Sequence, residues 1–345
     1  MQNVKIIFFG STSDSLIVLN KLHSLVIGHW SLDIVSVVTQ PPRPVGRKQT
    51  MTPTPVEMWA KEHKIPVLSF ASHPEKSWAY ADEQQVIDTL QPFKADLIVS
   101  ACYGQKIPSQ TISSAQFGGL NVHPSLLPRW RGADPVPWAI LSGDHQTGVT
   151  VVTLSEKFDD GNIIAQKKIP IVHSDTSPAL RTKLFTIGAD LLIEVLPGYL
   201  SRLSFPRTRE SRVKKIWIPG SSPRMTIRSM QTKFPYARRL SRHDGYEPWE
   251  ALEKSFLDPD EAIRIDRKFR AFSPWPGVWT EIAMQATQAS PARPDNKQKQ
   301  RLKILACHLS PEPYRLIMDI VQLEGKTPVS WKQFVSAHIP MQLSN

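Results

Sequence analysis

A short motif in the first half of the chain combines residue types that can move protons and stabilise negative charge. Residues 119–132 read GLNVHPSLLPRWRG. Asn121 and His123 lie at the end of the short apolar run with which this motif begins. Successive side chains of a β-strand alternate between faces, so Asn121 and His123 are predicted to point to one side and Val122 to the other. An amide can donate hydrogen bonds to an oxyanion, and an imidazole can exchange protons near neutral pH. The motif therefore sets two useful groups side by side where a strand gives way to a loop.

A pair of carboxylates follows later in the chain. Residues 158–161 read FDDG and come just after an apolar, strand-like run. We expect neighbouring parallel strands to bring Asp159 or Asp160 beside His123, where a carboxylate fixes the imidazole tautomer. No Ser/His pairing signature surrounds Ser125, so no activated nucleophile is evident. An Asn, a His and an Asp without a covalent nucleophile favour direct acyl transfer to an incoming amine.

Each of these residues also has a structural interpretation. A histidine at a strand end is often structural, an Asp-Gly pair often marks only a turn, and Asn121 alone could satisfy loop backbone groups. A metal site built from Asp159, Asp160 and His123 is another possibility. No HxH or HxxxH spacing supports such a site, and we predict that no metal is bound.

The elements that must position these residues alternate between strand-like and helical patterns. We predict strands at residues 5–10, 34–38, 67–70, 95–100, 119–123, 149–154 and 163–172. We predict helices at residues 11–25, 55–63, 83–90, 134–143 and 177–203. This alternation predicts an α/β domain with a Rossmann-like, mostly parallel sheet. Ligands of such sheets bind beyond the carboxyl ends of the strands, where Gly10 and His123 are expected.

Two nucleotide-binding motifs are absent. The first strand is followed by one glycine where a dinucleotide fingerprint has three. A GKT tripeptide occurs at residues 325–327, but Ile320 stands where a phosphate-binding loop needs its first glycine.

A proline-rich loop with basic residues follows the second predicted strand. Residues 40–55 read QPPRPVGRKQTMTPTP, in which each proline disfavours helix for itself and its predecessor. Arg43, Arg47 and Lys48 could contact a phosphate backbone from this loop. The alternative is an ordinary surface loop, because proline-rich loops with a few arginines are common.

The rest of the chain lacks strand-helix alternation. We predict a catalytic domain at residues 1–203, a linker or insertion at 204–226, and a second domain at 227–345. The second domain is predicted to contain a basic amphipathic helix at 261–272, short strands at 301–310, 314–321 and 325–334, and a polar loop at 285–300. Short strands of this kind predict a small β-barrel.

Charge is distributed unevenly along the chain. Residues 1–201 hold 17 Lys and Arg against 17 Asp and Glu, whereas residues 202–345 hold 25 against 14 and carry the whole net charge of +11. This split predicts a small-molecule site joined to a module that binds a polyanion, with a solvated basic surface as the alternative. No run approaches the ~20 apolar residues that cross a bilayer, and the start resembles no signal peptide. With only two distant cysteines, the chain is predicted to be cytoplasmic. We also expect a monomer without a membrane partner.

At this point the motifs become recognisable. LNVHPSLLPRWRGA, followed by FDDG, resembles the signature of the folate-dependent formyltransferases. The segments PRWRGA, TQPPRPVGR, AFSPWPGVW and VQLEGKTPVSWKQF are similar to members of that family that act on tRNA. The resemblance covers nearly the whole chain apart from residues 204–226, and it implies that the second domain is a barrel of the oligonucleotide-binding (OB-like) type. It implies transfer of a formyl group from 10-formyltetrahydrofolate to the α-amino group of methionine on initiator tRNA.

The resemblance also implies roles for individual residues. Asn121 would polarise the formyl oxygen, His123 would shuttle protons, and Asp159 would hold His123 or an ordered water. Folate contacts would come from a segment and a loop that comprise Tyr103, Gly104, Gln105, Lys106, Ile107, Ser125, Leu126, Leu127 and Pro128. Contacts with tRNA would come from the basic residues Arg43, Arg47, Lys48, Arg129 and Arg131. The last two arginines could instead only brace the loop.

Two other functions fit parts of this pattern. A related folate-dependent enzyme could formylate a sugar nucleotide or hydrolyse formylfolate, although neither would need a basic C-terminal part. A catalytically idle RNA-binding protein is the third possibility, against which the intact Asn121, His123 and Asp159 argue.

Overall fold

The computed structural model describes residues 2–46, 48–203, 234–283 and 299–338. The predicted linker 204–226, Arg47 and most of the predicted loop 285–300 lie outside the described residues. The chain forms two compact units. The first comprises Met1–Pro135, Gln146–Pro170 and Leu180–Ala237, and the second comprises Val136–His145, Ile171–Ala179 and Arg238–Asn345. The division into residues 1–203, 204–226 and 227–345 stays a prediction.

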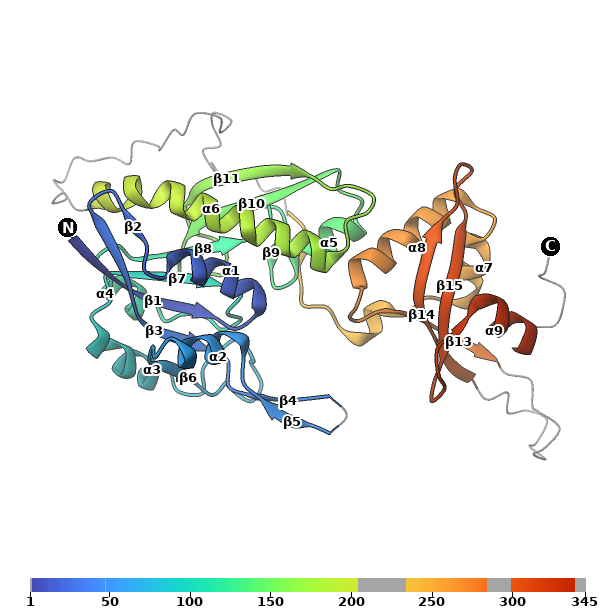
Figure 1. Ribbon diagram of the computed structural model, residues 1–345, viewed down its shortest axis with the longest axis horizontal. Coiled ribbons are helices and arrows are strands. Elements are labelled where there is room, and N and C mark those ends of the chain that lie inside the picture. The colour runs from blue at the N-terminus through green and yellow to red at the C-terminus, as the bar shows by residue number, and fades with distance from the viewer. Residues whose placement is uncertain (1, 47, 204–233, 284–298, 339–345) are drawn as a thin grey trace. The chain divides into compact units, whose positions relative to one another are not determined.

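The first unit is built on an eight-stranded mixed sheet (Figure 1). Its strands are β1 (Gln2–Gly10), β2 (Val26–Ile27), β3 (Trp30–Thr39), β6 (Val67–Ser69), β7 (Leu97–Ala101), β8 (Gly119–His123), β10 (Gln146–Thr153) and β11 (Ile163–Pro170). The spatial order is β11-β10-β8-β7-β1-β3-β2, with β6 also paired to β3. The pairs β1/β3, β1/β7, β3/β6 and β7/β8 are parallel. The prediction of an α/β, mostly parallel sheet is therefore confirmed.

The strand that precedes Asp159 runs in the direction opposite to the one we predicted. We expected parallel strands to carry the Asp159 loop to His123, but β10 runs antiparallel to β8 and pairs Thr150 with His123 and Thr153 with Leu120. The chain therefore leaves β10 beside the start of β8, and the loop at residues 154–162 folds back to reach His123. Strand direction was not readable, because a strand buried on both faces looks equally apolar in either direction.

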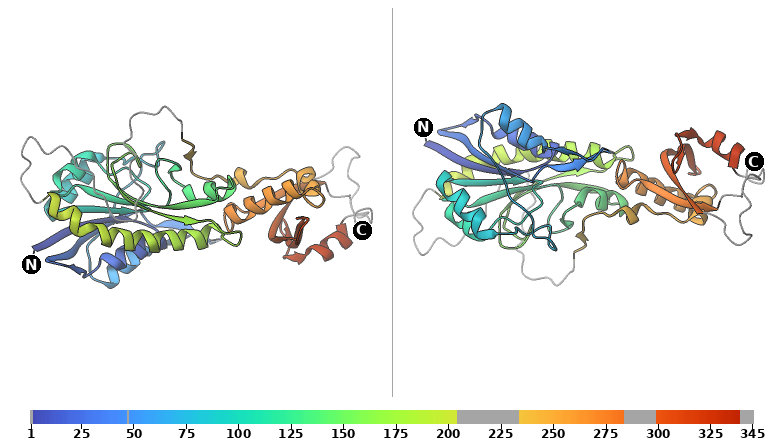
Figure 2. Two further views of the ribbon diagram at one scale, coloured as in Figure 1. Left: turned by 90° about the horizontal axis from the view of Figure 1, so that it is seen from above. Right: turned by 90° about the horizontal axis from the view of Figure 1, so that it is seen from below.

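The helices of this unit were mostly predicted. They are α1 (Ser13–Leu22), α2 (Pro55–Glu62), α3 (Glu83–Leu90), α4 (Ser109–Ser114), α6 (Ser177–Leu203) and the 3₁₀ helix η1 (Gln91–Phe93). Figure 2 shows α6 along one face of the sheet, where Gly188 lies against Val122 and Val149. By length and composition alone α6 could cross a membrane, which the sequence reading did not anticipate. More than half of its apolar window is buried inside the protein, as in a core helix.

The described residues of the proline-rich segment contain no helix before α2, but they are more regular than the predicted loop. β4 (Arg43–Val45) and β5 (Thr50–Thr52) pair as an antiparallel hairpin, and Thr54 caps α2 by accepting a hydrogen bond from the Glu57 amide. Figure 1 shows the β4–β5 hairpin extending from the body of the unit. A second short pair, β9 (Arg131–Gly132) and β12 (Tyr236–Ala237), is parallel.

The second unit contains a four-stranded antiparallel sheet, consistent with the small barrel that was predicted. Its strands are β13 (Val278–Ala283), β14 (Lys299–Leu309), β15 (Leu316–Leu323) and β16 (Val329–Ser330). Its helices are α7 (Trp249–Ser255), α8 (Pro259–Phe272), α9 (Trp331–His338), the 3₁₀ helix η2 (Arg242–Gly245) and most of α5 (Pro135–Leu141). The amphipathic helix predicted at 261–272 is confirmed as α8, whose Ala262 and Ile265 enter the core.

The strand predicted at 325–334 was wrong. Only Val329 and Ser330 are extended, and α9 starts at Trp331. The reason is a capping arrangement: the Gln333 amide donates to Ser330 Oγ, and the Gln333 side chain accepts a hydrogen bond from the Ser330 amide. Ser and Gln three residues apart are a helix-start signal that apolar periodicity alone does not reveal.

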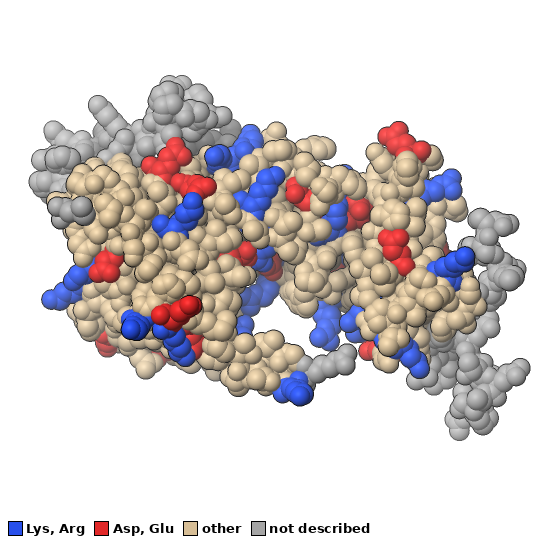
Figure 3. Space-filling view, in the orientation of Figure 1, with Lys and Arg blue, Asp and Glu red and all other residues tan. Residues whose placement is uncertain are grey.

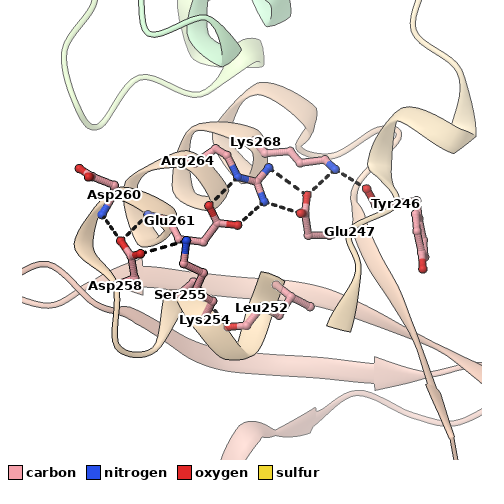
Figure 4. Close-up of polar contacts among 10 residues, drawn as sticks. All are labelled: Tyr246, Glu247, Leu252, Lys254, Ser255, Asp258, Asp260, Glu261, Arg264 and Lys268. Carbon is pink, nitrogen blue, oxygen red and sulfur yellow. Dashed lines mark hydrogen bonds and ion pairs between the residues drawn. The ribbon is translucent and has the colours of Figure 1, made fainter. Parts of the chain in front are cut away.

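A compact ionic network braces α8 (Figure 4). Glu247, only 3% exposed, accepts hydrogen bonds from Arg264 and from Lys268, whose Nζ lies 2.6 Å from Glu247 Oε2. Lys268 also donates to the Tyr246 carbonyl. At the helix start, Asp258 accepts the amide of Asp260 at 3.0 Å. Each charge in this network has an oppositely charged or polar partner.

Candidate active site

The predicted trio of Asn, His and Asp comes together in the first unit. Asn121 and His123 lie on the face of β8 opposite Val122, as predicted, and both contact one carboxylate oxygen. Asn121 Nδ2 lies 3.3 Å from Asp159 Oδ1, and His123 Nδ1 lies 3.4 Å from the same atom. The His123 and Asp159 side chains are 5% and 10% exposed, so this contact is shielded from water. Of the two neighbouring aspartates, Asp159 is therefore the one that faces His123.

The backbone around Asp159 is unusual. Asp159 has φ of 52°, a left-handed conformation uncommon outside glycine, and its Oδ2 accepts the Gly132 amide at 3.1 Å. The following glycine fits because a Cβ at Gly161 would lie 1.8 Å from the Thr153 carbonyl oxygen. Rare backbone conformations that persist often occur at functional sites. The FDDG sequence thus forms a tight return that aims one carboxylate at the β8 end.

The other nitrogen of His123 faces a main-chain oxygen. His123 Nε2 lies 3.0 Å from the Trp130 carbonyl, and Trp130 itself has φ of 60°. A neutral imidazole carries one N–H, so it can donate to only one of the two acceptors, Asp159 or Trp130. Taking up a proton gives His123 a second N–H, so that both ring nitrogens can then donate, one towards each oxygen. This geometry suits a residue that takes up and releases a proton.

The loop after His123 is fixed by buried polar bonds. Ser125 Oγ donates to the Arg129 carbonyl at 2.8 Å, and the Ser125 carbonyl accepts from Thr150 Oγ1 at 2.7 Å. The Gln166 side chain donates to the Leu127 carbonyl and to Thr150 Oγ1, each at 2.9 Å. Ser125 is 1% exposed, and its hydroxyl donates to the Arg129 and Trp130 carbonyls. Its role in the described structure is to shape the loop rather than to serve as a nucleophile.

The two arginines of this loop lie in different environments. Arg131 Nη2 forms an ion pair with Asp160 Oδ1 at 2.6 Å, and both side chains are about one-third exposed. Arg129 lies over the Trp130 ring, with its Cζ 4.6 Å from the ring centroid. The second aspartate of FDDG is therefore matched by Arg131 instead of adding an isolated charge beside His123. Both arginines therefore make contacts that stabilise the loop after His123.

Strand β12, about 100 residues later in the sequence, pairs with β9 beside Asp159, and the sequence analysis did not predict it. β12 pairs Tyr236 with Arg131 and Ala237 with Gly132. The Tyr236 ring lies where a side chain at position 132 would stand, which Gly132, with φ of +118°, leaves open. Burial, and then the charge of Asp159, raise the pKa of Tyr236. The ring is 61% exposed, so an aromatic surface stands beside the carboxylate.

The predicted folate segment is largely interior. Tyr103, Gln105 and Ile107 are each at most 5% exposed, whereas Gly104 is exposed. Tyr103 accepts a hydrogen bond at 3.0 Å from the hydroxyl of Tyr80, and burial raises the pKa of both phenols. Lys106 donates its amide to the Trp78 carbonyl at 2.8 Å. The segment therefore presents mainly backbone and the Gly104 position to its surroundings. Of the other predicted folate residues, Leu127 is buried, whereas Leu126 and Pro128 are partly exposed.

The predicted RNA-binding cations belong to several places. Arg43 and Lys48 are exposed on the β4–β5 hairpin, and Arg47 lies outside the described residues. The basic surplus of the C-terminal part is concentrated in residues 204–233, which hold eight Lys and Arg against one Asp or Glu. Positive and negative side chains are interspersed on the face drawn in Figure 3. The charge signal thus belongs mainly to the segment before β12 and not to the second unit's described sheet and helices.

Metal ions in proteins are usually held by groups of His, Cys, Asp and Glu side chains. Within the part of the chain that the structure describes, no group of three or more such residues is arranged to hold a metal ion. The two cysteines, Cys102 and Cys307, are both free thiols.

Comparisons with known proteins connect both parts of the chain to one kind of chemistry. Residues 4–196 match the family described as formyl transferase, and residues 255–338 match its C-terminal domain. A methionyl-tRNA formyltransferase of Listeria welshimeri is 32% identical over 343 residues, covering 96% of this chain and 95% of that protein. The enzyme of that name from Chloroflexus aurantiacus is 36% identical over 277 residues, covering 80% and 76%.

A solved structure resembles the chain over nearly its full length. A variant of HypX from Aquifex aeolicus matches with a TM-score of 0.52 at 14% identity, covering 97% of this chain and 49% of that one. At such low identity, the likeness concerns the fold alone.

Proposed function

The chain belongs to the formyl transferase family, and on this premise we propose that it moves a formyl group from 10-formyltetrahydrofolate to the α-amino group of methionine on initiator tRNA. The observation that carries the proposal is the convergence of Asn121 and His123 on the single carboxylate of Asp159. This set holds a donor for an oxyanion, a proton carrier and a group that orients it. The resemblance to curated methionyl-tRNA formyltransferases over most of the chain supports the choice of acceptor.

The reaction joins an amine nitrogen to the formyl carbon and breaks the bond between that carbon and N10 of the folate. Negative charge develops on the formyl oxygen during attack. Asn121 has one amide N–H directed at Asp159 and a second with no partner among the described residues, so the second can donate to this oxygen. His123 takes the proton that the amine loses and returns it to the departing N10. Asp159 holds the His123 ring in place while its charge changes.

We assign the folate site to the exposed backbone around Gly104 and to the loop at Leu126 and Pro128. The rigidity of both segments supports this assignment, because buried bonds of Gln105 and Gln166 fix them. Buried Tyr103, Ile107, Ser125 and Leu127 then support the site from beneath. Lys106 contributes through its backbone position. Pre-formed surfaces of this kind bind a ligand without a large ordering cost.

We propose that the tRNA is bound by several weakly specific phosphate contacts. The exposed hairpin residues Arg43 and Lys48 and the loop residues Arg129 and Arg131 would contribute, and Arg47 is included on sequence grounds alone. The eight cations of residues 204–233 would add long-range attraction. The expectation that the enzyme is monomeric and cytoplasmic and that it needs no metal belongs to the same proposal.

The proposal is tested with the full chain and radiolabelled 10-formyltetrahydrofolate. Initiator tRNA charged with methionine is the acceptor, and the same tRNA without amino acid is the matched control. Transfer of label to methionyl-tRNA and not to uncharged tRNA is the expected result. Release of labelled formate without transfer would identify a hydrolase, and transfer only to an amino sugar nucleotide would identify a different acceptor. Either of these outcomes would contradict the proposal.

A further inference from the structure

A series of side-chain hydrogen bonds, buried at its centre, links the segment around Gly104 to the β4–β5 hairpin. Gln105 and Gln40 are 2% and 8% exposed, and Gln40 Nε2 lies 2.7 Å from Gln105 Oε1. At one end, Arg43 Nη2 lies 2.5 Å from Gln40 Oε1. At the other end, Gln105 Nε2 lies 3.2 Å from Ser72 Oγ. Four residues from three separate parts of the sequence thus form one continuous path within the first unit.

The direction of these bonds is determined by chemistry. A guanidinium only donates hydrogen bonds, so Gln40 must turn its oxygen to Arg43 and its NH₂ group to Gln105. Gln105 must then present its oxygen to Gln40 and its NH₂ group to Ser72. The positive charge at one end polarises every bond in the same sense, which strengthens a buried chain.

The base of the hairpin is fixed independently. The backbone amide of Gln40 donates to Ser11 Oγ at 3.0 Å. The hydroxyls of Thr39 and Thr54, which flank the hairpin segment on its two sides, lie 2.6 Å apart. Beyond this base, β4 and β5 are exposed along their length. The side-chain bonds of Gln105 and Gln40 are therefore the part of this network that extends to a charged residue of the hairpin, Arg43.

We propose that Gln105 is a positioning residue for RNA binding, acting through Gln40 on Arg43. With its Nη2 held by Gln40, the guanidinium keeps a fixed orientation and presents its remaining N–H groups to a phosphate. An arginine that is already immobilised loses less conformational freedom on binding. The inference rests on the proposed function for the identity of the RNA, and it couples the segment assigned to folate with the hairpin assigned to tRNA.

The test is a pair of double-mutant cycles read by the affinity for fluorescently labelled initiator tRNA. Gln105→Leu replaces the amide with an apolar side chain of similar size and so removes the central hydrogen bond between Gln105 and Gln40. We expect this variant to weaken tRNA binding about threefold to tenfold. Combined with Arg43→Ala, it should weaken binding little further, because the residue on which it acts is gone. Lys48 lies on the same hairpin but takes no part in the hydrogen-bonded series from Ser72 to Arg43. When Gln105→Leu is combined with Lys48→Ala, the two losses of affinity should therefore multiply.

Three outcomes would overturn the inference: unchanged affinity in Gln105→Leu, multiplying effects with Arg43→Ala, or no tRNA binding by the wild-type chain. Gln40→Leu cuts the neighbouring link and should reproduce the cycle if Gln105→Leu does not fold. Formylation is assayed in parallel. Coupled binding without formyl transfer would reject the proposed function while leaving the positioning role intact.

Discussion

The two units each contain a buried carboxylate beside basic or polar groups, yet the two arrangements differ. Glu247 receives hydrogen bonds from Arg264 and Lys268 on both oxygens, and Lys268 is satisfied further by the Tyr246 carbonyl. Asp159 instead accepts the Gly132 amide at 3.1 Å and contacts the neutral amide of Asn121 at 3.3 Å and the His123 imidazole at 3.4 Å. In the first arrangement, cationic side chains occupy both carboxylate oxygens. The second leaves an amide hydrogen and an imidazole that can change partners.

The backbones under the two carboxylates differ in the same direction. Arg264 and Lys268 extend from the regular helix α8, whereas Asp159 and Trp130, on the two sides of His123, both have positive φ. Such conformations cost on the order of 1–3 kcal/mol each and persist only where the surroundings impose them. A fully matched network stabilises a fold, whereas a strained and partly matched one is suited to chemistry. The following predictions separate these two roles.

The largest effect is expected at His123. His123→Ala removes the proton carrier, and we expect kcat for formyl transfer to fall by on the order of 10²–10⁴-fold. The melting temperature should change little in comparison. His145, exposed and in the other unit, is the matched control, and His145→Ala should retain the wild-type rate. A His123→Ala enzyme with near wild-type kcat would remove His123 from the mechanism.

Glu247→Ala should act on stability. It leaves Lys268 buried without its carboxylate, and removing one partner of a buried pair costs on the order of 3–5 kcal/mol. Denaturant unfolding followed by tryptophan fluorescence measures the loss. Glu261 forms a more exposed pair with Arg264, so Glu261→Gln should change the unfolding free energy by less than about 1 kcal/mol. Equal effects of both variants would mean that the network does not brace α8.

A smaller effect is expected at Tyr236, whose ring lies over Gly132 and so over the amide that holds Asp159. Tyr236→Ala should lower kcat/KM about tenfold through misplacement of Asp159, whereas Tyr236→Phe should stay near wild type. Phe234→Ala is the control for an exposed aromatic on the same segment. If Tyr236→Phe were as slow as Tyr236→Ala, the hydroxyl and not the ring would be the active feature.

The smallest effect concerns acid stability of the second unit. The hydrogen bond from Arg238, aided by Ser241, lowers the pKa of Asp244. A carboxylate whose folded pKa is lowered contributes stability above its unfolded pKa, near 4, and loses it as pH falls towards the folded value. Asp244→Asn should therefore be less stable than wild type at pH 7, with the difference shrinking below pH 4. Thermal melts across pH 2–7 test this, and a constant difference would contradict the assignment.

Much of the fold was readable from sequence because its signals are local. Apolar runs that end at Gly10 and His123 marked two strands, and the spacing of Ala262 and Ile265 marked α8. Alternation along β8 placed Asn121 and His123 on one face. The helix-start signal of Ser330 and Gln333 is also local, but the apolar residues around it led us to predict a strand there.

The remaining features depend on contacts that sequence spacing does not encode. Strand direction decided how Asp159 reaches His123, and a run such as β10 carries no record of it. The Trp130 carbonyl is a backbone group without a residue-type signal. Tyr236 arrives more than 100 residues after Gly132, and no short motif links them. The chain from Gln105 to Arg43 likewise needs the folded structure to be seen.

The comparison of the two carboxylates is tested most directly by measuring formyl-transfer kcat and melting temperature on Asp159→Asn and Glu247→Ala side by side. We expect Asp159→Asn to lose at least about 10²-fold in kcat while its melting temperature stays close to wild type. We expect Glu247→Ala to melt several degrees lower but to keep the wild-type kcat at temperatures where it is folded. An Asp159→Asn enzyme that unfolds early but turns over normally would contradict the central claim.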